Sequence, residues 1–486
     1  MTLAELAAAC GATVRGDGAL TVTGLTHVSG KVRPGWVFAA LPGQRRHGGE
    51  FVAEAIAKGA VAVLSDRDPG EGVPWLASST PRRATALAAW ALAGHPERRL
   101  TMVGITGTNG KSTVADLVSR IAVAAGLGVG VLGTLAYTLP QRSERATRTT
   151  PEAPDLAPML AEIAASGGSV AVMEVSSHAL ELDRVTGLEF DVAVWTNLTR
   201  DHLDFHADPE SYFAAKRKLE GLLRGTPAGR RIVGADDATM ARLLATPRAG
   251  DLSFGLAPSR DVTATDVRFD PTGTDFRLQT PCGGTPVRLP LVGRHNLRNA
   301  LAAAAVAEAL GWPQGAVAHA LEAARPLPGR LEPVETELPF PIFVDYAHTP
   351  DALTQVLEAL REVSTRRLIV VFGCGGDRDP GKRAPMGEVV GRLADVPIVT
   401  SDNPRSEDPL AIVAAVMAGV RASGNPNAQA IPNRREAIAA ALALADEGSL
   451  VLVAGKGHET EQILATSTIP FDDRAVVREL AKRRSP

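Results

Sequence analysis

Cysteine, aromatic residues and excess charge of either sign are all scarce in this chain of 486 residues. Its three cysteines, Cys10, Cys282 and Cys374, lie far apart, which argues against a disulfide framework and favours a reducing compartment. Lysine and arginine number 51 and aspartate and glutamate 54, so bulk charge would not hold a nucleic acid. No apolar run reaches the roughly 20 residues of a membrane span, and the first ten residues lack the basic residue of a signal peptide. We therefore expect a cytoplasmic protein with no membrane span.

The chain is long enough for about three domains at roughly 150 residues each. Two polar segments that contain proline, His95–Arg99 and Arg325–Arg330, are typical of joints between domains. We predict an α/β fold class with three domains, over residues 1–97, 98–326 and 327–486. The first is a small α/β domain, the second a parallel-sheet domain of the P-loop ATPase type, and the third is Rossmann-like.

Short apolar segments alternate with helical patterns in each part, which indicates parallel sheets. The predicted strands are 21–25, 36–39, 60–64, 100–105, 169–175, 192–196, 342–345, 368–372, 398–401 and 450–454. A helix is expected at 51–58, and a helix-rich stretch at 296–324. Ligands of such sheets bind at the carboxyl ends of strands, where most of the polar motifs below are found.

A phosphate-binding loop follows the strand at 100–105. The segment Gly104–Thr113 reads Gly-Ile-Thr-Gly-Thr-Asn-Gly-Lys-Ser-Thr, and its glycines allow backbone N–H groups to face phosphate oxygens. Lys111 adds a point charge, Ser112 can ligate Mg²⁺, and the following helix contributes its dipole. Five residues separate Gly104 from Gly110, so the segment is a variant of the P-loop pattern. A plain glycine turn is the other interpretation.

Eight motifs together resemble the Mur ligase superfamily, whose relatives include the folylpolyglutamate synthetases. They are Gly107–Ser112, Met173–His178, Thr196–His202, Tyr212–Lys216, Asp345–Pro350, Gly373–Asp379, Asp402–Arg405 and Gly455–Glu459. The last three are most similar to the members that add the third residue of the peptidoglycan stem peptide. The resemblance implies three domains and ATP-dependent formation of an amide bond, and it also supplies the residue roles that follow.

The resemblance implies an ATP site on the central domain. Its residues are Gly107, Thr108, Asn109, Gly110, Lys111, Ser112, Thr113, Asn296, Arg330 and Asp345. The last two come from beyond the second joint and would close over the nucleotide. Asn296 could instead be a helix cap, and Arg330 and Asp345 could form a plain interdomain salt bridge.

Two Mg²⁺ ions are implied at the same place. Ser112, Glu174, His202 and Lys216 are the expected ligands, the last as a carbamate formed with CO₂. Together with Lys111, the last three form the predicted catalytic set, which would neutralise phosphate charge. The residues alone have plainer interpretations: Glu174 as a strand-end acid that accepts from local N–H groups, His202 as a histidine with a structural role, and Lys216 as a solvated surface charge.

A diamino dicarboxylic acid needs a bidentate cation for its far carboxylate and an acid for its far ammonium group. The predicted amino-acid site is Arg378, Asp402, Asn403, Pro404, Arg405, Gly455 and Glu459. Asp-Asn-Pro-Arg is similar to the motif of family members that use meso-diaminopimelate. Use of LL-diaminopimelate, ornithine or lysine stays open, and a plain proline turn is the other interpretation of the motif.

The acceptor nucleotide would lie on the first two domains. Its predicted contacts are Ser29, Gln44, Arg45, Arg46, Thr149, Thr150, Ser176 and Arg184, any of which could be a plain surface residue. The family usually shows Asp-Ser-Arg where this chain has Val28-Ser29-Gly30, so Lys31 or Arg45 would have to compensate.

The implied reaction joins a diamino acid, with meso-2,6-diaminopimelate favoured, to UDP-N-acetylmuramoyl-L-Ala-D-Glu (the UDP-MurNAc-dipeptide) in peptidoglycan precursor synthesis. ATP would first convert the side-chain carboxylate of D-Glu to an acyl phosphate. The expected partners are therefore small molecules, and we expect a monomer. Two other classes stay open: a related ligase of specialised metabolism, which the altered strip at Val28–Gly30 motivates, and a P-loop nucleotide-binding switch.

Overall fold

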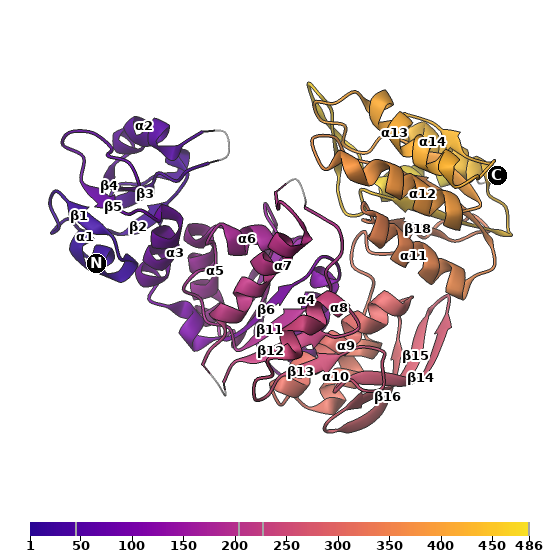
Figure 1. The fold of residues 1–486 in the computed structure, drawn as a ribbon, viewed down its shortest axis with the longest axis horizontal. Helices are drawn as coiled ribbons and strands as arrows, with labels where there is room; N and C mark the ends of the chain where they lie inside the picture. Colours follow the sequence, from indigo (N-terminus) through magenta and orange to yellow (C-terminus); the bar gives the residue numbers. More distant parts are fainter. Residues whose placement is uncertain (44–45, 203–204, 226–227, 485–486) are drawn as a thin grey trace.

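The computed structural model describes residues 1–43, 46–202, 205–225 and 228–484. Three sheets, each with its own helices, follow one another along the chain, and the first and third lie at opposite ends of the molecule (Figure 1). The predicted class, α/β with three domains, is confirmed. Within the described ranges, none of the helices is both long and apolar enough to cross a lipid bilayer.

The first part is a five-stranded sheet in the order β1-β5-β4-β3-β2, in which only β1 is antiparallel to its neighbour. Its elements are α1 (Leu3–Cys10), β1 (Thr13–Arg15), β2 (Gly24–Thr26), β3 (Trp36–Ala39), α2 (Val52–Ala57), β4 (Ala60–Ser65), β5 (Trp75–Ala77) and α3 (Pro81–Leu92). The strand predicted at 21–25 begins only at Gly24. A side chain on Gly24 would collide with the ring of Trp36, so this glycine lets β2 and β3 approach.

The central part is an eight-stranded sheet in the order β13-β12-β11-β6-β10-β7-β8-β9. The strands are β6 (Thr101–Thr106), β7 (Val129–Leu132), β8 (Ala136–Leu139), β9 (Arg142–Arg145), β10 (Val170–Glu174), β11 (Val192–Trp195), β12 (Arg230–Gly234) and β13 (Leu252–Phe254). Neighbouring strands are parallel except for the antiparallel pairs β7 with β8 and β8 with β9. Because β6 lies between β11 and β10, the loop that follows it is flanked by the ends of both strands.

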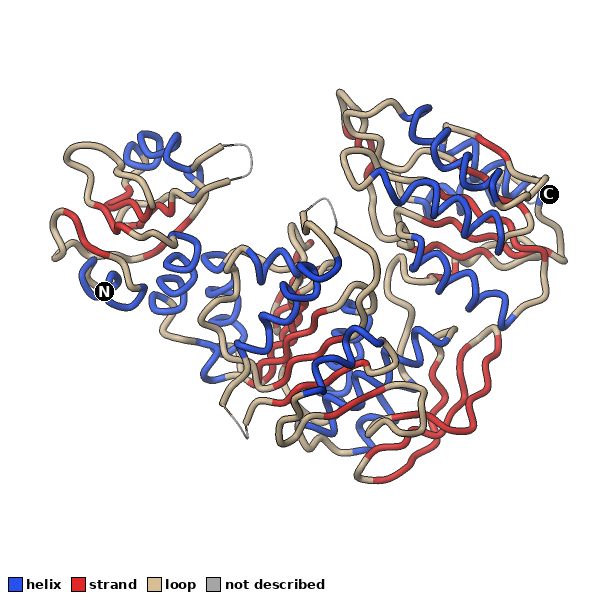
Figure 2. The backbone as a smooth tube through the Cα atoms, viewed as in Figure 1, coloured by secondary structure: helices blue, strands red, loops and turns tan. Residues whose placement is uncertain are grey.

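Helices cover both faces of this sheet (Figure 2). They are α4 (Lys111–Ala124), α5 (Ala153–Ala165), α6 (Ser177–Glu181), α7 (Pro209–Arg217), α8 (Ala238–Ala241), α9 (Arg294–Ala309) and α10 (Gln314–Glu322). A three-stranded antiparallel sheet that the sequence did not predict, β14 (Thr263–Asp270), β15 (Gly273–Thr280) and β16 (Gly283–Leu289), packs against the core around α9 and α10. The helix-rich stretch expected at 296–324 corresponds to α9 and α10.

The third part is a six-stranded sheet in the order β17-β18-β22-β19-β20-β21, parallel except for β17. The strands are β17 (Glu332–Pro333), β18 (Ile342–Asp345), β19 (Arg367–Phe372), β20 (Val396–Val399), β21 (Gln429–Ala430) and β22 (Ser449–Ala454). A hairpin follows, β23 (Glu461–Ile463) and β24 (Thr468–Pro470). The helices are α11 (Pro350–Val363), α12 (Arg383–Leu393), α13 (Pro409–Ala422), α14 (Arg434–Leu444) and α15 (Asp473–Lys482).

Alternation along β19 shows that this third sheet is doubly wound. Leu368 and Val370 pack in the core beneath α11, α12 and α13, whereas Ile369 and Val371 pack in the core beneath α14 and α15. Side chains of a strand point to alternate faces, so both faces of a central strand must be apolar when helices cover both. Asp345, at the carboxyl end of β18, lines a cavity together with residues of the central part, so this end of the sheet can contribute to a shared site.

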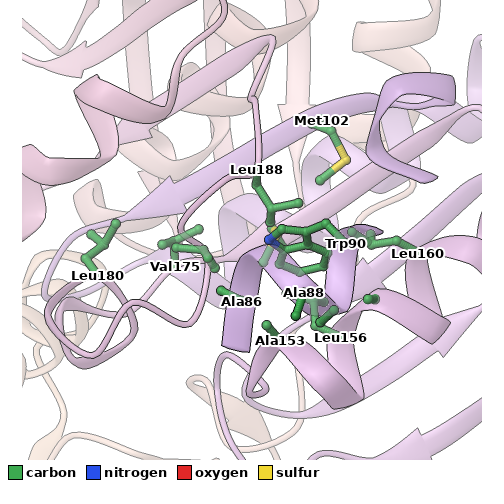
Figure 3. Packing of buried hydrophobic residues seen from close by; sticks show 14 of the residues in the cluster. Ala86, Ala88, Trp90, Met102, Ala153, Leu156, Leu160, Val175, Leu180 and Leu188 are labelled. Carbon is green, nitrogen blue, oxygen red and sulfur yellow. The ribbon is translucent and has the colours of Figure 1, made fainter. Parts of the chain in front are cut away.

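The first and second parts share one hydrophobic core, centred on Trp90 of α3 (Figure 3). The Trp90 side chain is fully buried among residues of both parts, including Met102 and Leu160, and its indole N–H donates to the carbonyl oxygen of Thr186 at 2.8 Å. Gly187, with a φ of 90°, lets the chain pass close to the indole ring. Burial of a large aromatic side chain stabilises a contact strongly, so α3 fixes these two parts together.

Candidate active site

The loop between β6 and α4 is held in shape by close approach to neighbouring segments. Gly107 has a φ of 144°, and a Cβ on it would collide with the hydroxyl of Thr196. Gly110 has a φ of 86°, and a Cβ there would collide with the side-chain oxygen of Asn299. The Thr196 hydroxyl donates to the carbonyl of Asn109 at 2.7 Å. Both positions therefore require glycine, because φ is positive and because a Cβ would clash. This is the backbone geometry of a loop that surrounds a phosphate group.

Lys111 and Lys216 converge on this loop from different helices. The Lys111 ammonium donates to the carbonyls of Gly107 and Thr108 at 3.0 and 2.8 Å, and the Lys216 Nζ donates to the same Gly107 carbonyl at 2.8 Å. Lys216 is 1% exposed and lies 4.4 Å from the centre of the Tyr212 ring. Lys216 is thus not the solvated surface charge that composition alone suggested.

The environment of Lys216 favours a neutral amine. Burial lowers its pKa well below the ordinary value, the nearby charge of Lys111 lowers it further, and Asp201 opposes both. An uncharged lysine is the form that reacts with CO₂, because only the free amine has a lone pair. The structure therefore supplies the chemical condition that the predicted carbamate needs.

Glu174, at the end of β10, is the best-anchored acid of the site. It is 2% exposed, and its Oε1 accepts from the Ser112 hydroxyl and the Thr134 N–H, both at 2.8 Å. Its Oε2 accepts from the Thr134 hydroxyl at 3.0 Å. That hydroxyl has one proton, so the Thr149 hydroxyl, 3.1 Å away, must be the donor to it. No sequence motif identified Thr134, which precedes β8.

Ser112 and Glu174 fit a Mg²⁺ ion. Mg²⁺ is typically held by one or two carboxylates, with phosphate oxygens and waters completing the shell. Within the ranges that the structure describes, no group of three or more His, Cys, Asp or Glu residues is arranged for a metal ion. A site beside the phosphate loop would therefore depend on the nucleotide for its remaining ligands.

His202 lies close to this centre but is more exposed than the other candidates. Its side chain is 45% exposed, it has a φ of 54°, and its Nε2 is 3.4 Å from a carboxylate oxygen of Asp201. The ring packs edge-on against His178 at a centroid distance of 4.9 Å. Its assignment as a metal ligand stays a prediction.

A cavity of about 360 Å³ extends from the phosphate loop to the third part of the chain. The central part contributes residues of the loop, of β12 and β13, and of the start of α9, and the third part contributes Arg330, Asp345 and residues of α11. The nucleotide-site residues predicted from the sequence that line it are Asn109, Gly110, Ser112, Thr113, Asn296, Arg330 and Asp345.

Three predicted nucleotide contacts have partners that the sequence did not reveal. Arg330 lies over the ring of Tyr346, 4.9 Å from its centre, and Asp345 accepts from the backbone N–H of Leu331 at 2.6 Å. No ion pair joins Arg330 to Asp345 in the described chain, which argues against a plain salt bridge. Burial raises the pKa of Asp345, and Arg330 opposes the shift. The Asn296 amide donates to the carbonyl of Val292 at 2.9 Å, and this hydrogen bond fixes the Asn296 side chain on the cavity wall.

Polar contacts connect the central part to the third. The Asn109 amide donates to a carboxylate oxygen of Asp351 at 3.0 Å, at the start of α11. Two further contacts are ion pairs, Arg200 with Asp379 at 3.4 Å and Arg145 with Glu461 at 3.9 Å. Asp351 was not predicted, and it places a carboxyl group from the third part directly on the phosphate loop.

The Asp-Asn-Pro-Arg and Gly-Lys-Gly-His-Glu motifs come together at the ends of β20 and β22. The Asn403 amide donates to the Glu459 carboxylate at 2.8 Å. Arg405 has a φ of 52°, and one of its guanidinium nitrogens donates to the carbonyl of Gly376 at 2.7 Å. A Cβ on Gly376 would collide with the carbonyl of Pro404, so the glycine is needed for this approach.

Two other predicted residues of this amino-acid site differ in their surroundings. Gly455 has a φ of 116° and lies beside the Asp402 carboxyl, which a Cβ on this glycine would meet at 3.8 Å, and both residues are buried. Arg378 is exposed, and its guanidinium donates to the neighbouring carbonyl of Asp377 at 3.2 Å. The structure therefore brings most of the predicted set together but leaves Arg378 facing solvent.

The predicted acceptor contacts fall into two separate places. Thr150, Ser176 and Arg184 lie together: the Ser176 N–H donates to the Thr150 hydroxyl at 3.0 Å, and Arg184 donates to the Thr150 carbonyl at 3.1 Å. Arg184 is also 2.9 Å from Glu152, and burial lowers its pKa.

The remaining acceptor candidates lie on the first part. The Ser29 hydroxyl donates to Glu54 at 2.7 Å, and Arg46 pairs with Glu50 at 2.8 Å. Gln44 and Arg45 fall outside the described residues. Lys31, considered as a compensating cation, is instead 3.4 Å from Asp155 of the central part.

Comparison with known proteins agrees with this arrangement. Three family models match in order: "Mur ligase family, catalytic domain" over residues 21–98, "Mur ligase middle domain" over 105–307, and "Mur ligase, glutamate ligase domain" over 329–457. The chain belongs to the Mur ligase family. The predicted resemblance is thereby confirmed, and with it the class of enzyme, an ATP-dependent ligase.

Individual members of the Mur ligase family match along almost the whole chain. The protein of Solibacter usitatus named UDP-N-acetylmuramoyl-L-alanyl-D-glutamate–2,6-diaminopimelate ligase is 44% identical over 463 residues, covering 95% of this chain and 94% of its own. The Streptomyces coelicolor protein of the same name is 43% identical, covering 99% and 96%. A solved structure with that name is 31% identical, with a TM-score of 0.69 and coverage of 100% and 99%. MurF of Thermotoga maritima, solved with ADP, is 20% identical with a TM-score of 0.67 and shares the fold.

Proposed function

We propose that this Mur ligase joins 2,6-diaminopimelate, in its meso form, to UDP-N-acetylmuramoyl-L-alanyl-D-glutamate, with conversion of ATP to ADP and phosphate. In this proposal residues 1–97 and the adjacent face of the central domain hold the acceptor, residues 98–326 hold ATP, and residues 327–486 hold the amino acid. The observation that carries the proposal is the cluster of Asn403, Arg405 and Glu459, which offers both a cation and an acid to one ligand. The names of the relatives support the same substrates.

The chemistry follows from the weak electrophilicity of a carboxylate. The side-chain carboxylate of D-glutamate attacks the γ-phosphorus of ATP, ADP leaves, and an acyl phosphate forms. The amine of the diamino acid then attacks the acyl carbon, loses a proton, and expels phosphate through a tetrahedral intermediate. Lys111 and the N–H groups of the phosphate loop stabilise the charge of the transferring phosphoryl group. Mg²⁺ ions held beside Ser112 and Glu174 would supply further neutralisation of phosphate charge.

Lys216 has a distinct part in the proposal. Its buried amine would react with CO₂, and the resulting carbamate, together with His202, would serve the second Mg²⁺ ion. Tyr212 and the Gly107 carbonyl fix the position of the amine before it reacts.

The amino-acid end of the site determines which substrate is used. Arg405 retains guanidinium N–H groups beyond the one that donates to Gly376, and these can form a bidentate contact with the far carboxylate. Glu459 is 31% exposed in its side chain and can accept from the far ammonium group. A lysine or ornithine substrate lacks the far carboxylate and would leave Arg405 without its partner.

The test is a panel of ATP, the UDP-dipeptide and single amino acids, with phosphate release and the mass of the product as readouts. We expect phosphate only when acceptor and amine are both present, and the largest kcat/KM with meso-diaminopimelate. Phosphate released from ATP alone would instead indicate a nucleotide switch. A product formed preferentially with lysine or ornithine would refute the diaminopimelate assignment while leaving the ligase intact.

A further inference from the structure

Lys456 is fully buried at the centre of the amino-acid site. It follows the end of β22 and lies between Gly455 and Gly457, both with positive φ. Its ammonium donates to the Asn403 side-chain oxygen at 2.9 Å and to the Glu459 carboxylate at 3.1 Å. A buried ammonium group is costly unless it is paired and hydrogen-bonded, so the contacts to Asn403 and Glu459 offset the cost of burying Lys456.

The charges around Lys456 do not cancel. Its Nζ lies 3.1 Å from Glu459 and 3.7 Å from Asp402, whose Oδ1 is buried without a hydrogen-bond partner among the described residues. The neighbouring Arg434 is neutralised by Asp473 in a fully buried pair at 2.6 Å. Two carboxylates against one ammonium leave one negative charge, which matches a single ammonium group from a ligand.

Lys456 also fixes which end of the Asn403 amide faces the ligand. An ammonium can only donate, so the amide oxygen must face it, and the backbone N–H of Ile463 donates to the same oxygen at 3.1 Å. The amide nitrogen therefore points the other way, and it donates to Glu459.

We propose that Lys456 is a positioning residue for the incoming amino acid: it holds Glu459 by one oxygen, which leaves the other for the substrate's ammonium group, and it shares with the backbone of Ile463 the orientation of the Asn403 amide. Being fully buried, Lys456 does not touch the substrate and acts through these two side chains. The inference rests on the proposed function, because it assigns Asn403 and Glu459 to the amino-acid site.

The decisive variant is Lys456→Met, which keeps the volume and removes the charge and the donors. Without the ammonium, Asp402 and Glu459 lose their shared cationic neighbour, and Oε2 of Glu459 loses the donor that holds it, so this carboxylate is no longer fixed in position for the substrate. We expect the KM for the diamino acid to rise by about tenfold or more, as for loss of a charge-assisted hydrogen bond. The KM for ATP and the kcat at saturating amino acid should each stay within about threefold, which a merely structural role would not produce.

A double-mutant cycle tests the route through Glu459. If Lys456 acts by orienting that carboxylate, Lys456→Met should raise the KM of the Glu459→Gln enzyme much less than that of the wild type. Lys456→Gln, which keeps neutral donors, should also raise the KM and provides a second measurement if the Met variant folds poorly. Arg231→Lys is the matched control, because Arg231 is 1% exposed and pairs with Glu220 and Asp251 in the central part. It should lower the melting temperature without a selective change in the amino-acid KM.

The outcomes separate this inference from the proposed function. A wild-type enzyme that forms product, combined with Lys456 variants whose amino-acid KM is unchanged or lower, would refute the role of Lys456 alone. Equal losses for ATP and the amino acid would show that Lys456 only maintains the fold. A wild-type enzyme that forms no product with any diamino acid would refute both the proposed function and the inference.

Discussion

The hydroxyl of Thr134 offers the sharpest test of how Glu174 is held and of its proposed part in binding Mg²⁺. It is the donor to Oε2 of Glu174, at 3.0 Å, in a pocket where the carboxylate is 2% exposed. Thr134→Val preserves the shape of the side chain and leaves both hydrogen bonds to Oε1 intact. A hydrogen bond to a charged group contributes about 1.5–3 kcal/mol. At about 1.4 kcal/mol per tenfold, kcat/KM for ATP should fall by roughly 10- to 150-fold.

Phosphate release at several Mg²⁺ concentrations measures this loss. Because the misplaced carboxylate would bind the ion less well, the deficit should shrink as Mg²⁺ is raised. Thr138→Val is the control, since Thr138 lies on the nearby strand β8 and its hydroxyl is hydrogen-bonded, among the described residues, to the exposed Ser143 at 3.2 Å. If both valine variants had the same activity, the hydroxyl of Thr134 would have no part in holding Glu174, and the reasoning would fail.

Three further changes should separate the parts of the site. The variants Lys216→Ala and Lys216→Arg should both lose most of the ligase activity. Neither should show the ¹³C NMR signal of a carbamate after incubation with labelled bicarbonate. Full activity in either variant would exclude the carbamate. Arg405→Ala should raise the KM for meso-diaminopimelate by about 10- to 100-fold with little change for ATP, in steady-state assays. Arg434→Met leaves the buried Asp473 without its partner and should lower the free energy of unfolding of the third domain by about 3–5 kcal/mol in calorimetry. The double variant Arg434→Met with Asp473→Leu should recover most of that stability. A double variant as unstable as the single one would contradict that account.

The sequence predicted those parts of the fold and site that local patterns determine. The strand at 342–345 matches β18, and the strand at 36–39 matches β3, because a short apolar run between turns is a local signal. The phosphate loop was recognisable because glycine, lysine and serine occur at fixed spacing before a helix. In the same way, Glu174 was found as an acid at the end of an apolar strand.

Residues that act through long-range contacts escaped prediction. Thr134 reaches Glu174 across 40 positions and Asp351 reaches Asn109 across 242, and neither carries a signal of its own. Lys456 lies within a quoted motif, yet its burial depends on side chains that other segments bring. The sheet β14–β16 was missed because it alternates half-exposed residues without a strong apolar run. The burial of Lys216 likewise depends on the packing of α7 against the loop, which helical periodicity does not reveal.

The two joints of the molecule differ in kind. The first is closed by the shared core around Trp90. Across the second, apolar packing includes Val292 against the core of the third part, and polar contacts are added to it, among them Arg145 with Glu461, whose side chains are 68% and 52% exposed. Exposed ion pairs weaken as salt screens them, while apolar contacts do not. Raising ionic strength should therefore loosen the third domain alone and enlarge the molecule in X-ray scattering, with the first two domains still moving as one body. The cavity beside the phosphate loop, whose walls come from both sides of that second joint, would then be assembled in a smaller fraction of the molecules at high salt.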